Sequence, residues 1–132
     1  TYTNRGIALG SSGRFEAAIE DLTEAVSIEP GMRMAWYNRA LATSALGRYR
    51  EAIADLTRAI EIDPGYAEAY HNRGVAHANL AQYGEAIEDF KSSVAIRPSA
   101  AAYMNLATAY RMAGRAAQAE ESLREAARLG TQ

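Results

Sequence analysis

The sequence has no cysteine, only three prolines and charges that nearly cancel, with 14 basic against 16 acidic residues. The absence of cysteine excludes disulfides, thiolate metal sites and thiol nucleophiles. Because the net charge is small, we expect neither nucleic acid nor a membrane surface as a partner. No apolar run approaches the ~20 residues that cross a bilayer. What the sequence does have is abundant alanine, which favours helix.

The three prolines mark an internal repeat. Pro30, Pro64 and Pro98 are spaced by 34 residues, and each follows an apolar and acidic stretch. Windows of this length bring residues of like kind into register, and a fourth window fits when one residue after Pro98 is removed. The aligned positions are Tyr2, Trp36, Tyr70 and Tyr103; Gly6, Ala40, Gly74 and Ala107; Ala18, Ala52, Ala86 and Ala119; Leu22, Leu56, Phe90 and Leu123.

Each window predicts two helices joined by a turn. The apolar positions have helical spacing, and it is interrupted at Gly13, Gly47 and Gly114 and, in the third window, at Ala81. The second helix should end before the proline, which lacks an amide donor and disfavours helical angles at the preceding residue. A single helical hairpin cannot bury its apolar face alone, so neighbouring hairpins must stack.

The sequence resembles the tetratricopeptide repeat family. Trp36, Ala40, Ala52, Leu56 and Pro64 match its pattern, and the third window repeats that match. The prediction is an all-α, right-handed α-solenoid of four tandem 34-residue helix-turn-helix repeats in a single domain. The repeats are expected at about 1–32, 33–66, 67–99 and 100–132, within a longer protein. The resemblance implies a module that binds a peptide segment of a partner protein, without catalysis or a cofactor.

One departure from the family pattern is a recurring arginine. Arg5, Arg39 and Arg73 stand where the family usually has leucine, and an aspartate follows 16 residues after each. In the fourth window both are missing, with Leu106 and Ser122 in their places. A half-buried guanidinium needs a partner, so we predict three ion pairs between the helices of a repeat. The alternative is a row of arginines that binds anionic ligands.

The resemblance also implies that the first helix of each repeat lines a concave groove. The strongest recurring feature there is an asparagine in the same slot of all four repeats, whose amide can pair with both the carbonyl and the amide of an extended peptide. The predicted peptide-binding residues are Asn4, Asn38, Asn72, Asn105, Met34, Tyr37, Leu41, His71, Val75, Met104, Thr108 and Arg111. Further groove positions are Thr3, Ile7, Ser11, Ser44, Glu68, Asn79 and Met112.

Other interpretations of these positions remain open. The asparagines could instead bond the neighbouring helix and fix the stacking, and methionines at helical spacing such as Met104 and Met112 more often pack in a core. The family's basic clamp for acidic chaperone tails is incomplete, because Glu68 and Asn72 occupy two of its basic slots.

No group of residues predicts catalysis or a metal site. His71 and His77 are the only histidines, and their spacing of six residues does not suit shared ligation of a metal on one helix. We expect His77 to be a hydrogen-bonded core residue and His71 to face the groove. The remaining alternatives are a scaffold that self-associates head to tail through its repeat ends, giving a homo-oligomer, and the recruiting arm of a larger enzyme.

Overall fold

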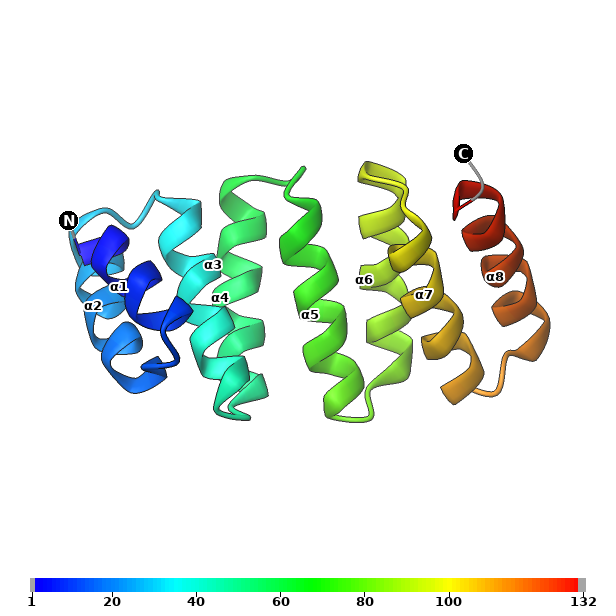
Figure 1. Ribbon diagram of the computed structural model, residues 1–132, viewed down its shortest axis with the longest axis horizontal. Helices are drawn as coiled ribbons and strands as arrows, with labels where there is room; N and C mark the ends of the chain where they lie inside the picture. The colour runs from blue at the N-terminus through cyan, green and yellow to red at the C-terminus, as the bar shows by residue number, and fades with distance from the viewer. Residues whose placement is uncertain (1, 131–132) are drawn as a thin grey trace. The chain divides into compact units, whose positions relative to one another are not determined.

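The computed structural model describes residues 2–130, and eight α-helices account for most of them (Figure 1). In chain order they are α1 (Tyr2–Ser11), α2 (Phe15–Ile28), α3 (Arg33–Ala45), α4 (Tyr49–Ile62), α5 (Ala67–Asn79), α6 (Tyr83–Ile96), α7 (Ala100–Met112) and α8 (Ala116–Gly130). No strand occurs in the described part of the chain. The predicted all-α architecture of four helix-turn-helix pairs is therefore confirmed.

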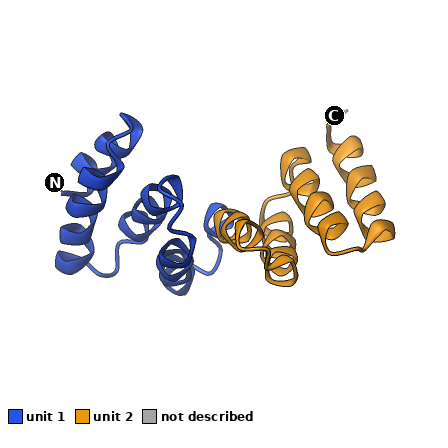
Figure 2. Ribbon diagram, turned by 90° about the horizontal axis from the view of Figure 1, so that it is seen from below, with its two compact units in different colours: residues 1–69 blue, residues 70–132 orange. Residues whose placement is uncertain are grey.

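The helices form two compact units, residues 1–69 and residues 70–132 (Figure 2). In the first unit α1 packs against α2 and α3, and α3 packs against α4. In the second unit α7 packs against α6 and α8. Each unit has its own core, centred on Leu22 and Leu56 in the first and on Ile87 and Phe90 in the second.

The turn within each helix pair depends on one residue with positive φ. Gly13, Gly47 and Gly114 have φ of +82°, +76° and +77°, and Ala81 takes the same role with φ of +60°. In every turn the next amide donates to a carbonyl five residues earlier, as Arg48 N does to Thr43 O at 2.9 Å. This is the hydrogen bond of the Schellman motif, which satisfies a carbonyl left over at the helix end.

The prolines end the second helices as the sequence predicts. Helices α2, α4 and α6 stop at Ile28, Ile62 and Ile96, two residues before each proline. The residue before each proline has a non-helical backbone, with φ between −138° and −129° and ψ between 80° and 94°. Proline disfavours helical angles at the residue that precedes it.

The repeated small residues allow the two helices of a pair to approach closely. Ala18, Ala52 and Ala86 are fully buried. A Cβ added to Gly74 would lie 2.9 Å from the Phe90 ring, and one added to Gly6 would overlap the Leu22 side chain. Larger residues at these positions would hold the helices apart. Small residues therefore recur every 34 residues because each repeat has the same close contact between its two helices.

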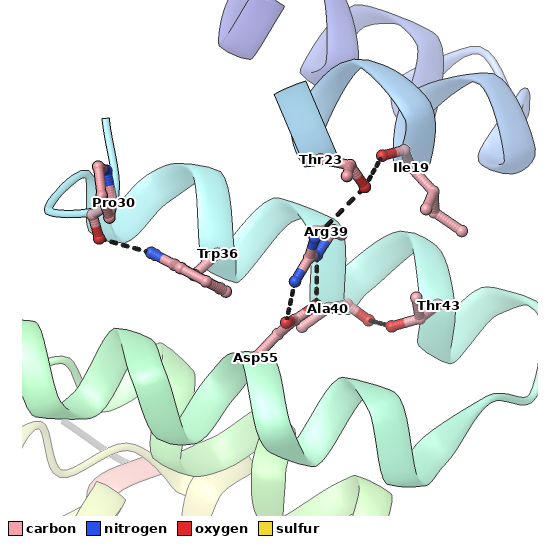
Figure 3. A network of polar contacts seen from close by, with 8 residues as sticks. All are labelled: Ile19, Thr23, Pro30, Trp36, Arg39, Ala40, Thr43 and Asp55. Carbon is pink, nitrogen blue, oxygen red and sulfur yellow. Dashed lines mark hydrogen bonds and ion pairs between the residues drawn. The ribbon is translucent and has the colours of Figure 1, made fainter. Parts of the chain in front are cut away.

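The three predicted ion pairs are present. Arg39 donates to both carboxylate oxygens of Asp55, at 2.9 Å and 2.7 Å (Figure 3). Arg73 binds Asp89 and Arg5 binds Asp21 in the same two-pronged way. The arginines are thus neutralised within their own repeats, which favours the structural interpretation over a row of anion-binding arginines.

The arginine of the second repeat also connects two neighbouring repeats. Its Nη1 donates to Thr23 Oγ1 on α2 at 3.3 Å, and its guanidinium lies 5.1 Å from the centre of the Trp36 ring. The Trp36 indole donates to Pro30 O at 2.8 Å (Figure 3). The tryptophan therefore ties the start of α3 to the loop that precedes it.

Candidate peptide-binding site

The predicted binding residues all lie on the first helices of the pairs, α1, α3, α5 and α7. Several expose large apolar side chains to solvent, with Met34 48% exposed, Leu41 38% and Met104 55%. Arg111 and Thr108 are exposed as well, whereas Val75 is half-buried. These helices therefore combine accessible apolar surface with polar groups, as a surface for a peptide requires.

The structure brings two of these residues together in a pocket of the first unit. This unit-1 pocket has a volume of about 220 Å³ and lies among α1, α2 and α3. Its lining includes the predicted residues Asn38 and Leu41, with Ile7 facing them from α1 and Phe15 from α2. Gly6 and Gly10 of α1 also line this pocket.

Three more of the predicted residues meet in a pocket of the second unit. This unit-2 pocket has a volume of about 300 Å³ and lies among α5, α6 and α7. Val75 lines it from α5, and Asn105 and Thr108 line it from α7. The rest of its lining is Ala78, Asn79, Tyr83, Phe90, Ala109 and Met112.

The two pockets occupy the same place in the repeat. Ile7, Phe15 and Ser11 of the first unit correspond to Val75, Tyr83 and Asn79 of the second, each 68 residues later. After the one-residue deletion, Asn38 and Leu41 correspond to Asn105 and Thr108. The recurring asparagine, Asn38 in the first unit and Asn105 in the second, thus lines the equivalent pocket in both units.

Three polar side chains on these walls each donate a hydrogen bond to a backbone carbonyl four residues earlier. Asn38 Nδ2 donates to Met34 O at 2.7 Å, and Asn79 Nδ2 donates to Val75 O at 2.9 Å. Thr108 Oγ1 donates to Met104 O at 3.0 Å. Each bond lies within the residue's own helix, so Asn38 does not serve to bond the neighbouring repeat here. The side-chain oxygens of Asn38, Asn79 and Thr108 can still accept hydrogen bonds, for example from peptide amides.

The two histidines have different environments. The predicted hydrogen bond of His77 is present, with its Nδ1 2.7 Å from Gln82 Oε1, but His77 is half-buried and not a core residue. The ring of His71 lies 5.7 Å from that of Phe90, and burial lowers the pKa of His71 below its usual value. His71 is therefore neutral at pH 7 and offers a ring rather than a charge.

Tyr37, another predicted residue, belongs to an aromatic cluster at the start of α3. Its ring lies 5.0 Å from that of Tyr66, over which the Arg33 guanidinium sits at 4.4 Å. Arg33 also binds Asp63 Oδ2 at 2.6 Å. Burial raises the pKa of Tyr66 to about 12, so this ring stays neutral.

Two sequence interpretations require correction. Thr3 does not belong to an open groove, because it is buried and its hydroxyl donates to Met32 Sδ at 3.3 Å. Met104 and Met112 are not core residues, since 55% and 57% of their surfaces are exposed. Flexible thioethers at the surface suit adaptable contacts with a ligand.

The sequence reasoning missed the rings that the second helices contribute. Phe15 and Tyr83, each the first residue of a second helix, form walls of the two pockets. The 34-residue register contained this signal, because Phe15, Tyr49 and Tyr83 are aligned aromatic residues.

Among residues 2–130, no cluster of three or more His, Cys, Asp or Glu side chains is placed to hold a metal ion. None of the described helices is long and apolar enough to span a membrane.

The paired helices and the recurring pockets define an α-helical repeat protein of the kind built for contacts with other proteins. Four models of the TPR or tetratricopeptide repeat match residues 1–32, 42–80, 67–100 and 99–132. The chain belongs to the tetratricopeptide repeat family. A search of curated protein sequences finds no match.

Solved structures resemble the chain over most of its length. A crystal structure of MamA matches with a TM-score of 0.95 and 25% identity, covering 98% of this chain and 77% of that one. MamA from Desulfovibrio magneticus RS-1, residue 41 to the end, matches with a TM-score of 0.92 at 21% identity, covering 98% of this chain and 74% of that one. The second TPR of Spaghetti (RPAP3), bound to the HSP90 peptide SRMEEVD, is 31% identical with a TM-score of 0.71, covering 73% of this chain and 89% of that one.

Proposed function

We propose that the chain is a protein-interaction module that binds a peptide segment of a partner protein on the first helices of its repeats. The observation that carries this proposal is the recurrence of one pocket, walled by the same asparagine, in both units. The related repeat domain of Spaghetti, which is bound to a peptide, supports the proposal.

The chemistry of the pockets suits an extended peptide. Such a chain presents an amide donor and a carbonyl acceptor at each residue, and an asparagine amide complements both. Neighbouring first helices are expected ~10 Å apart, a distance that about three residues of extended chain span. Within each unit, one peptide side chain would enter the pocket while the peptide backbone passes the asparagine.

The test uses peptides selected on the protein itself. A phage-displayed library of twelve-residue peptides is panned on the chain, and selected peptides are titrated by fluorescence anisotropy. In the double variant Asn38→Ala and Asn105→Ala we expect binding about 30-fold weaker, from two hydrogen bonds of about 1 kcal/mol each. The melting temperature should not change.

The matched control removes polar groups from second helices. Ser27→Ala and Gln118→Ala change exposed residues of α2 and α8, and this double variant should bind the selected peptides as the wild type does. Equal binding by both double variants, or a lower melting temperature with unchanged affinity, would contradict the proposal.

The peptide of the Spaghetti complex serves as a second probe. SRMEEVD is acidic, and two slots that are basic in the family's clamp hold Glu68 and Asn72 here. We expect SRMEEVD to bind weakly, and Glu68→Lys to strengthen its binding because the substitution replaces a repulsive charge with an attractive one. A tight complex with the wild-type chain would show that the clamp does not need those slots.

A further inference from the structure

The unit-2 pocket differs from the unit-1 pocket in what surrounds its asparagine. Tyr83 and Phe90 both line the unit-2 pocket, and so does the largely exposed Met112. The corresponding lining of the unit-1 pocket has one ring, Phe15, and the slot of Met112 holds Ala45 there. The two pockets therefore share a backbone register but differ in their chemistry.

The amide of Asn105 is available to a ligand. It is half-buried on the wall of the unit-2 pocket, and among residues 2–130 the structure gives it no hydrogen-bond partner. Among the described residues no buried side-chain nitrogen or oxygen lacks a hydrogen-bond partner, so the Asn105 amide is accessible to water, which a ligand with both a donor and an acceptor can replace. A peptide group of an extended chain supplies both.

Size and ring chemistry define the side chain that fits. A closed cavity of about 150 Å³ accommodates benzene, and the open unit-2 pocket has about twice that volume. Aromatic pairs gain energy beyond the area they bury, and sulfur contacts with rings are also favourable. Tyr83, Phe90 and Met112 offer both kinds of contact to a bound ring.

We propose that the unit-2 pocket binds an aromatic side chain of the partner peptide, and that the Asn105 amide holds the backbone of that same residue. This inference rests on the proposed peptide-binding function and names the residue type that the function selects. The unit-1 pocket, with one ring and a smaller volume, is less selective for aromatic side chains.

The test uses a probe that carries only the recognised group. N-acetyl-phenylalanine N-methylamide contains one benzyl side chain and two peptide groups, and its leucine and alanine analogues are the comparison probes. Each is titrated into the whole chain labelled with ¹³C at the methyl groups of isoleucine, leucine, valine and methionine. Val75 and Met112 report on the unit-2 pocket, and Ile7 and Leu41 report on the unit-1 pocket in the same spectrum.

We expect saturable shifts at Val75 and Met112 with the phenylalanine probe. Its apparent affinity should be at least about threefold higher than that of the leucine probe, as aromatic contacts imply. Asn105→Ala should weaken binding about fivefold, the effect of one lost hydrogen bond. Asn38→Ala, the same change in the other unit, should leave the Met112 response unchanged.

Three results would overturn the inference: equal affinity for the leucine and phenylalanine probes, no effect of Asn105→Ala, or equal affinities reported by the two pockets. A second variant, Thr108→Trp, places a large ring on an exposed position at the edge of the pocket. It should abolish the Met112 response, whereas Leu41→Trp, its counterpart in the first unit, should not.

Failure of this inference is distinguishable from failure of the proposed function. If library peptides bind and lose affinity in the asparagine double variant but the phenylalanine probe is not preferred, the peptide-binding function stands and the aromatic specificity is wrong. If the panning yields no binding peptide, the proposed function itself fails, and the inference that rests on it fails too.

Discussion

The turn at Ala81 offers a sharp test of how the repeat stabilises its helix pairs. An L-residue in the left-handed region costs roughly 1–2 kcal/mol, and Ala81 adopts φ of +60° there. Glycine removes this cost, although its greater freedom in the unfolded chain takes back about 0.4–1 kcal/mol. Ala81→Gly should therefore stabilise the protein by about 0.5–1 kcal/mol.

The reverse substitution supplies the matched control. Gly47 occupies the same turn with φ of +76°, and a Cβ added there meets no atom within 4 Å. Gly47→Ala should thus destabilise the protein by about the same 0.5–1 kcal/mol through its backbone alone. The assay is equilibrium unfolding in urea, followed by circular dichroism, with the change taken from the midpoint. A loss of stability in Ala81→Gly would refute the reasoning.

Three further substitutions probe other contacts. Arg39→Ala should lower the free energy of unfolding by about 2–3 kcal/mol, because it leaves a buried carboxylate unpaired, and urea unfolding should show a much smaller loss for the exposed Arg5→Ala. Gly74→Ala should cost about 1–3 kcal/mol by overpacking against the Phe90 ring, measured as a fall in melting temperature. Because burial lowers the pKa of His71, the unfolded chain binds a proton more readily than the folded one, so stability is lost as the pH falls below about 6.5. Urea midpoints at pH 5 and pH 7.5 should differ less in His71→Gln than in the wild type.

The sequence predicted the features that depend on the repeat register. The ion pair of Arg39 with Asp55 followed from two residue types that occur together in three repeats and are absent together from the fourth. The ends of α2, α4 and α6 followed from the chemistry of proline. Both predictions were possible because the 34-residue repeat determines which positions of neighbouring helices face each other.

Features that depend on the direction of a single side chain could not be predicted in this way. The register placed Asn38 on a first helix, but the donation of its amide to Met34 O depends on its rotamer. Likewise, Thr3 falls on a groove position by register, yet it is buried because the chain before α3 brings Met32 against it. The volumes of the two pockets could not be predicted from the register either, because they depend on how rings from the second helices fill the space between first helices.

The chain separates the positions that maintain the fold from those that distinguish its two pockets. Ala18, Ala52 and Ala86 are identical and fully buried in three repeats, as close packing requires. The pocket walls change at exposed positions, with Leu41 in the first unit and Thr108 in the second. Exposed substitutions away from caps and strained turns usually change stability little. Ligand preference can therefore diverge between the two pockets at little cost to folding, while the recurring asparagine keeps the same place for a peptide backbone in both.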